Sequence, residues 1–309
     1  MSHNLRTLCF VFLLLLISAW GANALASNSA KILIIANSKA AAYQQVINSF
    51  KATLNTADFK VHYLSKIDNK LEFIASEIKT TQPKLIFALG VASTKVAMHS
   101  TNSIPIVTTM VVKSSFFQQA SNITGVILAY PLSTQLKWLK KTLPDFNQIA
   151  ILYNQKENLS TINNATKIAT KMGLNITAIP VDTAKQLPYA LEQLKKNVQV
   201  LLAIPDRVAM SPKTAKAVLL ASFRNRIPMI GLTDNWVKSG ALYALSWDYA
   251  DIGQQCADQA TSLINGRSIK QVPVAFPEQV HYVINKTIME RMKIPLSESL
   301  FLKAKRVFE

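Results

Sequence analysis

The stretch Lys84-Leu85-Ile86-Phe87-Ala88-Leu89-Gly90, followed at once by a helical pattern from Ala92, decides the fold. A continuous apolar run of this length is typical of a strand that is buried on both faces of a parallel sheet. Glycine at the end of the run permits a tight turn from strand into helix. The stretch therefore predicts one βα unit of a doubly wound α/β fold.

The same unit recurs along both halves of the chain. In the first half, further strands are predicted at 31–36, 60–64 and 104–108. The pattern restarts with strands predicted at 122–126, 148–153, 175–181, 198–204 and 227–231, and with helices at 132–143, 161–172, 185–196 and 212–223. Two consecutive βαβ halves of similar size predict an α/β protein of two Rossmann-like lobes with parallel sheets. No Pro-, Gly- or Ser-rich linker separates the halves, so short crossovers are expected to join them.

The N-terminus has the pattern of a secretory signal peptide. Arg6 precedes an apolar run over 8–17, and small residues with two overlapping Ala-x-Ala sites follow at 22–26. We expect cleavage after Ala26, with Ala24 as the alternative. The apolar run is shorter than the roughly 20 residues that a membrane-spanning helix needs. The pattern therefore predicts export without a membrane anchor.

The composition indicates a folded protein with a basic surface. Half of the residues are hydrophobic and 17% are charged, which excludes a disordered chain. The formal net charge of +17 raises the question of an anionic partner. The lysines, however, are scattered on the polar faces of predicted helices, as at Lys137, Lys140, Lys141, Lys195 and Lys196. Without an Arg-rich run or interleaved aromatic residues, we predict a solvated basic surface and no nucleic-acid site.

No motif for catalysis or for a cofactor is present. The sequence lacks a Gly-x-Ser-x-Gly elbow, a phosphate loop and a His-Glu-x-x-His helix. His62, His99 and His281 lie far apart, and Cys256 is the one cysteine that remains once the leader is removed with Cys9. We therefore predict no enzyme, no cofactor, no metal and no disulfide, and a Cys256 thiol that is packed rather than reactive.

Ligands of open parallel sheets bind beyond the carboxyl ends of the strands, which selects the turns to consider. Ala92, Ser93 and Thr94 follow one such strand, where backbone N–H groups and hydroxyls form an anion site that suits a ligand carboxylate. The alternative is a plain helix N-cap by Ser93 or Thr94. Thr109 follows the next strand, either as a ligand contact or as a solvent-facing hydroxyl.

Polar residues also follow two strands of the second half. The predicted loop over 153–160 is rich in hydrogen-bonding groups and includes Asn154, Glu157, Asn158 and Ser160. Asp206 directly follows another predicted strand. Its carboxylate could receive a ligand ammonium; the alternatives are that it caps the next helix or pairs with Arg207.

The chain also carries a family resemblance. It rests on 227–231 (IPMIG), 237–242 (VKSGAL), 248–253 (DYADIG), 264–266 (ING), 272–274 (VPV), 283–286 (VINK), 294–296 (IPL) and Ala304. These stretches resemble the ABC-transporter substrate-binding proteins related to tryptophan- and tyrosine-binding lipoproteins, and the similarity extends over essentially the whole mature chain. The resemblance implies a type I periplasmic-binding fold, with two Rossmann-like lobes, three hinge crossings and a ligand at the interface.

The resemblance also implies which parts of the chain form each lobe. After the leader at 1–26, we expect the first lobe to comprise 27–121 and about 245–275, and the second lobe to comprise 122–244 and about 276–309. By family position, Ala92, Ser93 and Thr94 form the first-lobe ligand turn, while Asn154, Glu157, Asn158, Ser160 and Asp206 belong to the second-lobe side. Trp247 and Tyr249, close to a predicted crossing, either stack on an apolar part of the ligand or pack the hinge.

The combined prediction is a monomeric solute-binding protein of the periplasm. It is expected to close over a small molecule, such as an amino acid or an organic anion, and to deliver it to an ABC permease. The alternative is a sensor that presents its ligand to a membrane receptor. The sequence lacks a lipobox, which predicts a form free in the periplasm. The loops at 36–40 and 109–113 depart from the family pattern, so an aromatic amino acid is one option for the ligand.

Overall fold

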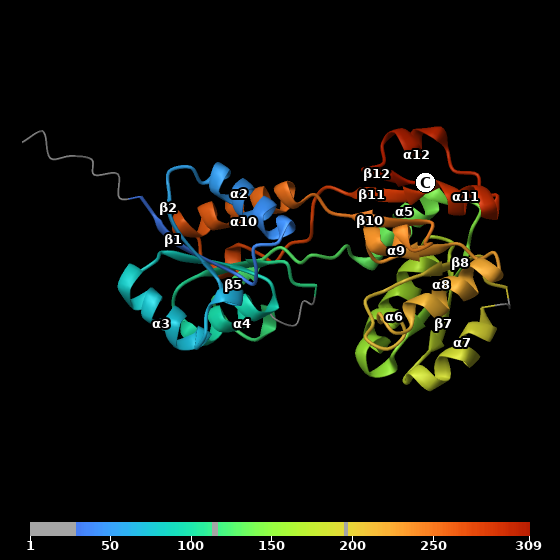
Figure 1. The fold of residues 1–309 in the computed structure, drawn as a ribbon, viewed down its shortest axis with the longest axis horizontal. Helices are drawn as coiled ribbons and strands as arrows, with labels where there is room; N and C mark the ends of the chain where they lie inside the picture. The colour runs from blue at the N-terminus through green and yellow to red at the C-terminus, as the bar shows by residue number, and fades with distance from the viewer. Residues whose placement is uncertain (1–28, 113–116, 195–196) are drawn as a thin grey trace, which may run out of the picture.

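The computed structural model describes residues 29–112, 117–194 and 197–309. The predicted signal peptide with Cys9 lies outside these residues, as do Lys195 and Lys196. Within them the chain forms two α/β lobes, each built around one sheet and joined by extended crossings (Figure 1). Across the described ranges, no helix combines the length and the apolar character that crossing a membrane requires.

The first lobe is a five-stranded parallel sheet with the strand order β2-β1-β3-β4-β5. Its strands are β1 (Lys31–Ala36), β2 (Asp58–Tyr63), β3 (Leu85–Leu89), β4 (Ile106–Thr109) and β5 (Ile123–Gly125), and its helices are α2 (Ala41–Thr53), α3 (Lys70–Thr81), α4 (Val91–Ser100) and α10 (Tyr249–Ile264). Every residue of β3 is buried, because α2 and α10 cover one face of the sheet while α3 and α4 cover the other. The predicted buried parallel strand is confirmed.

Helix α10 comes from the last quarter of the sequence and packs against α2 (Figure 1). Phe50 of α2 stacks on Phe87 of β3, with ring centroids 3.9 Å apart. Gly253 lets the two helices approach closely, since a Cβ there would lie 2.4 Å from the Val46 carbonyl oxygen. Cys256 follows one turn later and is fully buried. Burial raises the pKa of its thiol, so the packed thiol expected from the sequence is confirmed.

The second lobe is a seven-stranded sheet with the order β12-β11-β10-β9-β8-β6-β7. Its strands are β6 (Gln148–Tyr153), β7 (Asn175–Pro180), β8 (Val200–Leu202), β9 (Met229–Gly231), β10 (Tyr243–Ser246), β11 (His281–Asn285) and β12 (Arg306–Phe308). One face is covered by α5 (Leu132–Thr142), α6 (Gln155–Lys171), α11 (Lys286–Met292) and α12 (Glu298–Leu302). The other face is covered by α7 (Leu187–Gln193), α8 (Ala215–Arg224) and α9 (Asp234–Lys238).

Neighbouring strands of this sheet run parallel except for β10 and β11. Strand β10 ends at Ser246 and leads to the first lobe, and β11 starts at His281, which lies opposite Ser246 in the register. Because the chain returns from the first lobe beside the point where it left, β11 has to run in the opposite direction. The predicted parallel sheet therefore contains one antiparallel pair, which lies at the hinge.

One predicted strand belongs to the other lobe. The sequence pattern assigns 122–126 to the second lobe, but β5 is the edge strand of the first sheet. The Thr124 hydroxyl donates a hydrogen bond to the Val272 carbonyl oxygen, 2.7 Å away. Gly125 (φ +151°) lets β5 lie close to its neighbour β4, because a Cβ at this position would lie 1.8 Å from the Thr108 carbonyl oxygen of β4. The chain therefore crosses to the second lobe only after β5, and Val126 and Leu128 still pack in the core of the first lobe.

Three segments cross between the lobes (Figure 1). They are 126–131 between β5 and α5, 247–248 between β10 and α10, and 272–280 between α10 and β11. The first and third run side by side, since the backbone N–H of Ile127 donates to the Ala275 carbonyl oxygen at 2.9 Å. The three crossings therefore form one hinge.

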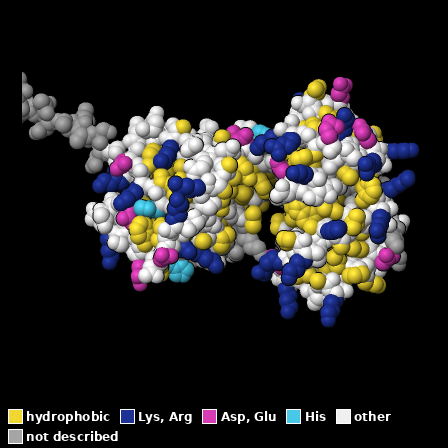
Figure 2. Space-filling view, viewed as in Figure 1, with side chains coloured by type: hydrophobic (Ala, Val, Ile, Leu, Met, Phe, Trp, Pro, Cys, Tyr) yellow, Lys and Arg dark blue, Asp and Glu magenta, His cyan; other side chains and the backbone are white. Residues whose placement is uncertain are grey.

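The surface of both lobes is basic. Figure 2 shows Lys and Arg side chains scattered over the visible face of each lobe rather than gathered in one patch. Lys137, Lys140 and Lys141 are exposed on α5, as the sequence predicts. In the same view, hydrophobic side chains border the gap between the lobes.

Gly125 combines a positive φ with a close backbone contact, and Gly266, which has a positive φ but no close neighbour, separates the two effects. We expect Gly125→Ala to lower the free energy of unfolding by roughly 3 kcal/mol or more, because the new Cβ clashes with the Thr108 backbone. Gly266→Ala also places a side chain at positive φ (+91°), but nothing lies within 4 Å of the new Cβ. That variant should lose only about 1–2 kcal/mol. Equal losses in urea unfolding would show that the contact with Thr108 is unimportant.

Candidate functional site

An open cleft of about 700 Å³ lies at the hinge, between the lobes. Its wall includes Ile127, Ala129 and Tyr130 of the first crossing, Asn158 and Pro205 of the second lobe, and Phe276 of the third crossing. A smaller cavity of about 190 Å³ adjoins it and has Leu232 and Trp247 in its wall. The cleft has the size of a small-molecule site. Its wall is mixed, and its polar residues are Gln135, Glu157, Asn158, Ser160, Thr161 and Asn164.

The turn from β3 into α4 holds the first group of predicted residues. The backbone N–H and the hydroxyl of Ser93 both donate to Asn37 Oδ1, each at 2.9 Å. The hydroxyl of Thr94 donates to the Gly90 carbonyl oxygen at 2.9 Å. Both side chains are fully buried, whereas Ala92 is exposed at the start of the helix. The Ser93 and Thr94 hydroxyls, which were predicted to face a ligand, therefore form hydrogen bonds inside the first lobe.

The alternative prediction for this turn, a helix cap by Ser93 or Thr94, is wrong. Helix α4 starts at Val91, with Gly90 (φ +90°) at the cap position. The Asn37 side chain, just after β1, accepts a hydrogen bond from the backbone N–H of Ser93, the kind of group that an N-cap side chain would otherwise bind. Its carbonyl oxygen therefore lies at the positive end of α4, where an anionic group would also be stabilised.

Thr109 connects β4 with the hinge. Its hydroxyl donates to the Val126 carbonyl oxygen of the first crossing at 2.9 Å, and the residue is fully buried. It is therefore not a solvent-facing hydroxyl. Met110 follows with φ +60°, a conformation that few residues other than glycine adopt. This sharp change of direction brings Val112 into the wall of the cleft.

The predicted loop over 153–160 is in fact the beginning of α6, which starts at Gln155 rather than near Thr161. Asn154 is its N-cap, and Asn154 Oδ1 accepts from the backbone N–H of Glu157 at 3.1 Å. Asparagine at the cap with glutamate three residues later is a recognised start signal for a helix. The correction moves these polar side chains from a loop to the start of a helix.

Asp206 lies at the centre of the polar group in the second lobe. Its Oδ2 accepts from the Asn154 backbone N–H at 2.6 Å and from the Asn158 side-chain amide at 2.8 Å. Its Oδ1 accepts from the N–H groups of Val208 and Ala209 at 2.9 and 2.8 Å. The residue is 6% exposed. Since a carboxylate accepts about four hydrogen bonds, Asp206 is already saturated, and it caps the segment that follows it.

Arg207 pairs with Glu157 and not with Asp206. The backbone N–H of Arg207 donates to Glu157 Oε2 at 3.1 Å, and its Nε lies 3.5 Å from Oε1. Glu157 and Asn158 also line the cleft. The structure therefore brings Asn154, Glu157, Asn158 and Asp206 together at one side of the cleft, while Ala92, Ser93 and Thr94 belong to the opposite lobe.

Trp247 occupies the second crossing and packs against the cores of both lobes. It also forms part of the wall of the smaller cavity. Its indole Nε1 is enclosed and has no hydrogen-bond partner among the described residues. Trp247 thus has the position that either predicted role requires, since it packs the hinge and borders the site.

The Tyr130 hydroxyl joins all three crossings. It belongs to the first crossing and donates to the carbonyl oxygens of Ser246, at the second, and of Gln279, in the third, at 2.8 and 2.7 Å. A phenol has one hydrogen, which the two carbonyls therefore share. Burial raises the pKa of Tyr130 to about 12, so the group remains protonated and able to donate.

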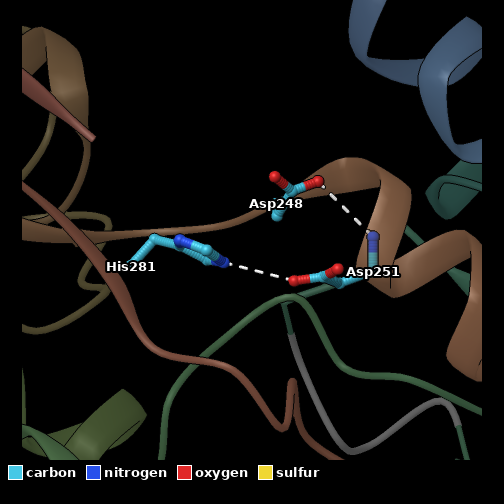
Figure 3. Close-up of side chains that lie close together, drawn as sticks. All are labelled: Asp248, Asp251 and His281. Carbon is cyan, nitrogen blue, oxygen red and sulfur yellow. Dashed lines mark hydrogen bonds and ion pairs between the residues drawn. The ribbon is translucent and has the colours of Figure 1, made fainter.

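A second contact spans the hinge (Figure 3). His281 Nε2 of β11 lies 3.2 Å from Asp251 Oδ2 of α10. Asp248 caps α10 by accepting from the Ala250 N–H at 2.8 Å. Atoms of Asp248, Asp251 and His281 lie within 4.8 Å of one another, a spacing that a metal ion could use. Helix capping and the contact between the lobes already account for this arrangement.

Sequence reasoning missed Asn37, Tyr130 and Asp234. Asn37 directly follows β1, and Asp234 lies three residues beyond β9, so the rule about carboxyl ends of strands could have found both. The Ser246 hydroxyl donates to Asp234 Oδ1 at 2.9 Å. Tyr130 gave no such signal, because its partners lie 116 and 149 residues away in the sequence.

Comparison with known proteins gives a family and a distant relative. The ABC transporter substrate binding protein family matches residues 64–308. The Tyrosine-binding protein of Clostridioides difficile (strain R20291) is 24% identical over 228 residues, which cover 71% of this chain. The match spans 66% of that relative, slightly less than two thirds of its length.

Solved structures show the same fold. The ligand-free, open structure of a substrate-binding protein with adhesive properties from Clostridium difficile matches with a TM-score of 0.75 at 22% identity, over 90% of this chain and 99% of that one. An ABC domain in complex with L-Trp from Streptococcus pneumoniae matches with a TM-score of 0.60 at 16% identity, over 91% and 100%. The type I periplasmic-binding architecture expected from the sequence is confirmed.

The shared hydroxyl at the hinge can be tested by removing it. We expect Tyr130→Phe to lower the free energy of unfolding by about 1–3 kcal/mol, because the buried Ser246 carbonyl and the partly buried Gln279 carbonyl lose their donor. Small-angle scattering should also show a wider spread of lobe separations, since one link between the crossings is gone. The control is Tyr189→Phe, which makes the same change at a residue that is 73% exposed. If both variants behave like the unmodified protein, the hydroxyl does not hold the hinge.

Proposed function

Because this chain belongs to the ABC transporter substrate-binding protein family, we propose that it binds an aromatic amino acid in the cleft and delivers it to an ABC permease. The family is one of binding proteins and not of enzymes, so the prediction that the chain is not an enzyme is confirmed. The observation that carries the ligand proposal is the aromatic lining of the cleft and of the cavity beside it, by Tyr130, Phe276 and Trp247.

Two features support the ligand class. The relative from Clostridioides difficile is named a tyrosine-binding protein, and the streptococcal structure was solved with L-Trp. In this chain, Phe276 is 42% exposed in the wall of a cleft of about 700 Å³. Aromatic rings in a wall of this kind can pack against an aromatic group of the ligand in an offset-stacked or edge-to-face arrangement.

We place the ligand carboxylate at the start of α4. Ala92 is exposed there, and the helix N-terminus favours a negative group. Ser93, Thr94 and Thr109 serve the site indirectly, since their hydroxyls fix the turn and the hinge. The Asn37 amide, which now accepts from Ser93, would lie beside the carboxylate.

The second lobe then supplies the other half of the site. Glu157 and Asn158 line the cleft and orient the polar part of the ligand. The Asp206 carboxylate holds the start of α6 in place, because it accepts hydrogen bonds from the Asn154 backbone N–H and from the Asn158 side-chain amide. Trp247 stacks on the apolar part of the ligand where the second crossing borders the cavity.

Splitting the site between the lobes couples binding to closure. A ligand that contacts one lobe has equal affinity for the open and closed forms, and it cannot shift the equilibrium between them. A ligand that reaches both α4 and α6 gains contacts only when the hinge closes. The closed form is the state that a permease would recognise.

The proposed setting is the periplasm. We propose that residues 1–26 direct export and are removed, and that the remaining chain acts as a monomer. The permease is its membrane partner. Stimulation of the ATPase of a reconstituted ABC permease by the liganded protein would support delivery, whereas a sensor would leave that ATPase unaffected.

The ligand proposal is tested on the purified mature protein. We expect isothermal titration calorimetry to give a Kd of about 1 μM or below, roughly 8 kcal/mol of binding free energy, for L-tyrosine or L-tryptophan. L-Alanine and L-glutamate serve as controls and should bind at least about a hundredfold more weakly, because they lack the aromatic group. Native mass spectrometry should show a matching mass that is lost on unfolding. Absence of binding to both aromatic amino acids contradicts the proposal.

The polar group around Asp206 generates a second prediction. Asp206→Ala should weaken binding of the same amino acid by more than about tenfold, because the start of α6 loses its anchor. It should also lower the free energy of unfolding by about 3 kcal/mol or more, since four buried donors lose their acceptor. Asp145→Ala, at an exposed carboxylate in the same lobe, is the control. Unchanged affinity in calorimetry would remove Asp206 from the site.

A further inference from the structure

A titratable contact joins the two lobes at the hinge (Figure 3). His281 of β11 belongs to the second lobe and Asp251 of α10 to the first, and His281 Nε2 lies 3.2 Å from Asp251 Oδ2. Among the ion pairs formed between residues that the structure describes, no other one joins the lobes. The two side chains are 30% and 35% exposed, so protons from the solvent reach the pair.

The pair lies on the other side of the hinge from the cleft. Tyr130 lines the cleft, and its hydroxyl donates to the Gln279 carbonyl oxygen. Gln279 lines a separate hollow of about 120 Å³ together with Asp248 and Asp251, and no described residue is common to the walls of this hollow and of the cleft. The Tyr130 hydroxyl therefore lies between the cleft and the contact of His281 with Asp251.

This arrangement gives closure opposite effects on the two sides of the hinge. When two lobes rotate about a joint, groups in front of the joint approach each other and groups behind it separate. The contact of His281 with Asp251 is formed in this structure, in which the cleft is open. Closing the cleft about the Tyr130 hydroxyl therefore lengthens the distance from His281 to Asp251, so the pair stabilises the open form.

Acidic groups surround the pair. The hollow that contains Asp251 is also lined by three further carboxylates, those of Asp248, Asp258 and Glu278. In the second lobe, the Asp234 carboxylate accepts from the hydroxyl of Ser246, which lies opposite His281 in the sheet. Carboxylates ordinarily keep their charge near neutral pH.

The other charged or titratable groups on the elements next to β11 also keep their protonation near neutral pH. The basic ones are Lys238 at the end of α9 and Lys305 and Arg306 at β12. Lys305 donates to the Trp247 carbonyl oxygen at 2.5 Å. Burial raises the pKa of the Tyr130 phenol to about 12. Of these side-chain types, histidine is the one that ordinarily changes charge between about pH 5 and 8.

We infer that protonation of His281 holds the lobes open, which makes the hinge sensitive to pH. A hydrogen bond from an imidazolium to a carboxylate is roughly twice as strong as one from a neutral donor. Acid therefore strengthens the contact and favours the open form, and rising pH weakens the contact and permits closure. A ligand that closes the lobes then competes with protons, whatever its chemical class. The inference goes beyond the proposed function, because it concerns the hinge of the ligand-free protein.

The test measures the separation of the lobes without a ligand. Spin labels are attached to the variant with Lys79→Cys on α3 and Lys171→Cys on α6, which places one exposed label on each lobe. Cys256 is fully buried and stays unlabelled. Double electron–electron resonance is recorded at about pH 5.5 and about pH 8, with EDTA present to remove divalent cations. We expect the ratio of open to closed forms to be about two- to fivefold higher at the lower pH, the size of effect of a partly exposed ion pair.

Two variants separate His281 from other titrating groups. His281→Gln keeps a side-chain N–H donor without a charge, so its ratio of open to closed forms should be the same at both pH values and match that of the unmodified hinge at about pH 8. Asp251→Asn should also abolish the response, which keeps the test decisive if one variant fails to fold. His99→Gln, at an exposed histidine of α4, is the matched control and should keep the full response.

Three outcomes would overturn the inference. They are a pH response that survives in both hinge variants, no response in the unmodified hinge, and a shift toward the closed form in acid. Each of these outcomes leaves the proposed function standing, because no ligand is present in the experiment.

Discussion

The chain has to pass between two sheets three times, and the Tyr130 hydroxyl lies where these passages meet. It donates to carbonyl oxygens of the second crossing, at Ser246, and of the third, at Gln279. A single hydrogen shared by two acceptors is a weaker constraint than two separate bonds, because the donor can favour either carbonyl as the crossings rotate. This hydroxyl therefore links the crossings while leaving them free to bend, and the Ile127–Ala275 and His281–Asp251 contacts are further links across the hinge. The direction of β11 follows from the return of the chain to the second lobe beside the point where it left, since the first residue of β11, His281, pairs with Ser246 at the end of β10.

The site is built outward from this hinge. Ser246 supplies its carbonyl to Tyr130 and its hydroxyl to Asp234, so one residue connects the crossings with a carboxylate beside the cleft. On the first-lobe side, the Thr109 hydroxyl connects β4 with the first crossing at Val126. A change in hinge angle therefore moves groups that border the ligand, and a ligand that fixes those groups restrains the hinge. Polar residues that do not touch the cleft can influence affinity in this way.

The fold was largely accessible from the sequence, because fully buried strands such as 84–90 are continuous apolar runs that few other structures accommodate. Several errors occur where a residue's partner is remote, although the start of α6 was missed despite a local signal in Asn154 and Glu157. Nothing local assigns 122–126 to the first sheet, since the decisive contact of Gly125 is with Thr108 of a neighbouring strand. The rule about strand ends selected Ser93 as a ligand contact, but its hydroxyl turns inward because Asn37, 56 residues away, accepts from it. Hydrogen-bond partners of this kind are set by tertiary packing, which periodicity does not encode.

Several polar groups at the cleft, among them Glu157, Asn158 and the neighbouring Asp206, are already bonded within their own lobe, and this has a consequence for recognition. The saturated Asp206 gains little from a ligand, because a new hydrogen bond would replace an existing one rather than water. Such groups give the site its shape, and discrimination falls to groups with unused hydrogen-bonding capacity, such as the enclosed indole N–H of Trp247. A site that leaves polar groups unpaired until the right partner arrives rejects analogues that lack the matching group more strongly than it rejects small changes in apolar size. Under the proposed function, selectivity should therefore depend more on the polar end of the ligand than on which aromatic ring it carries.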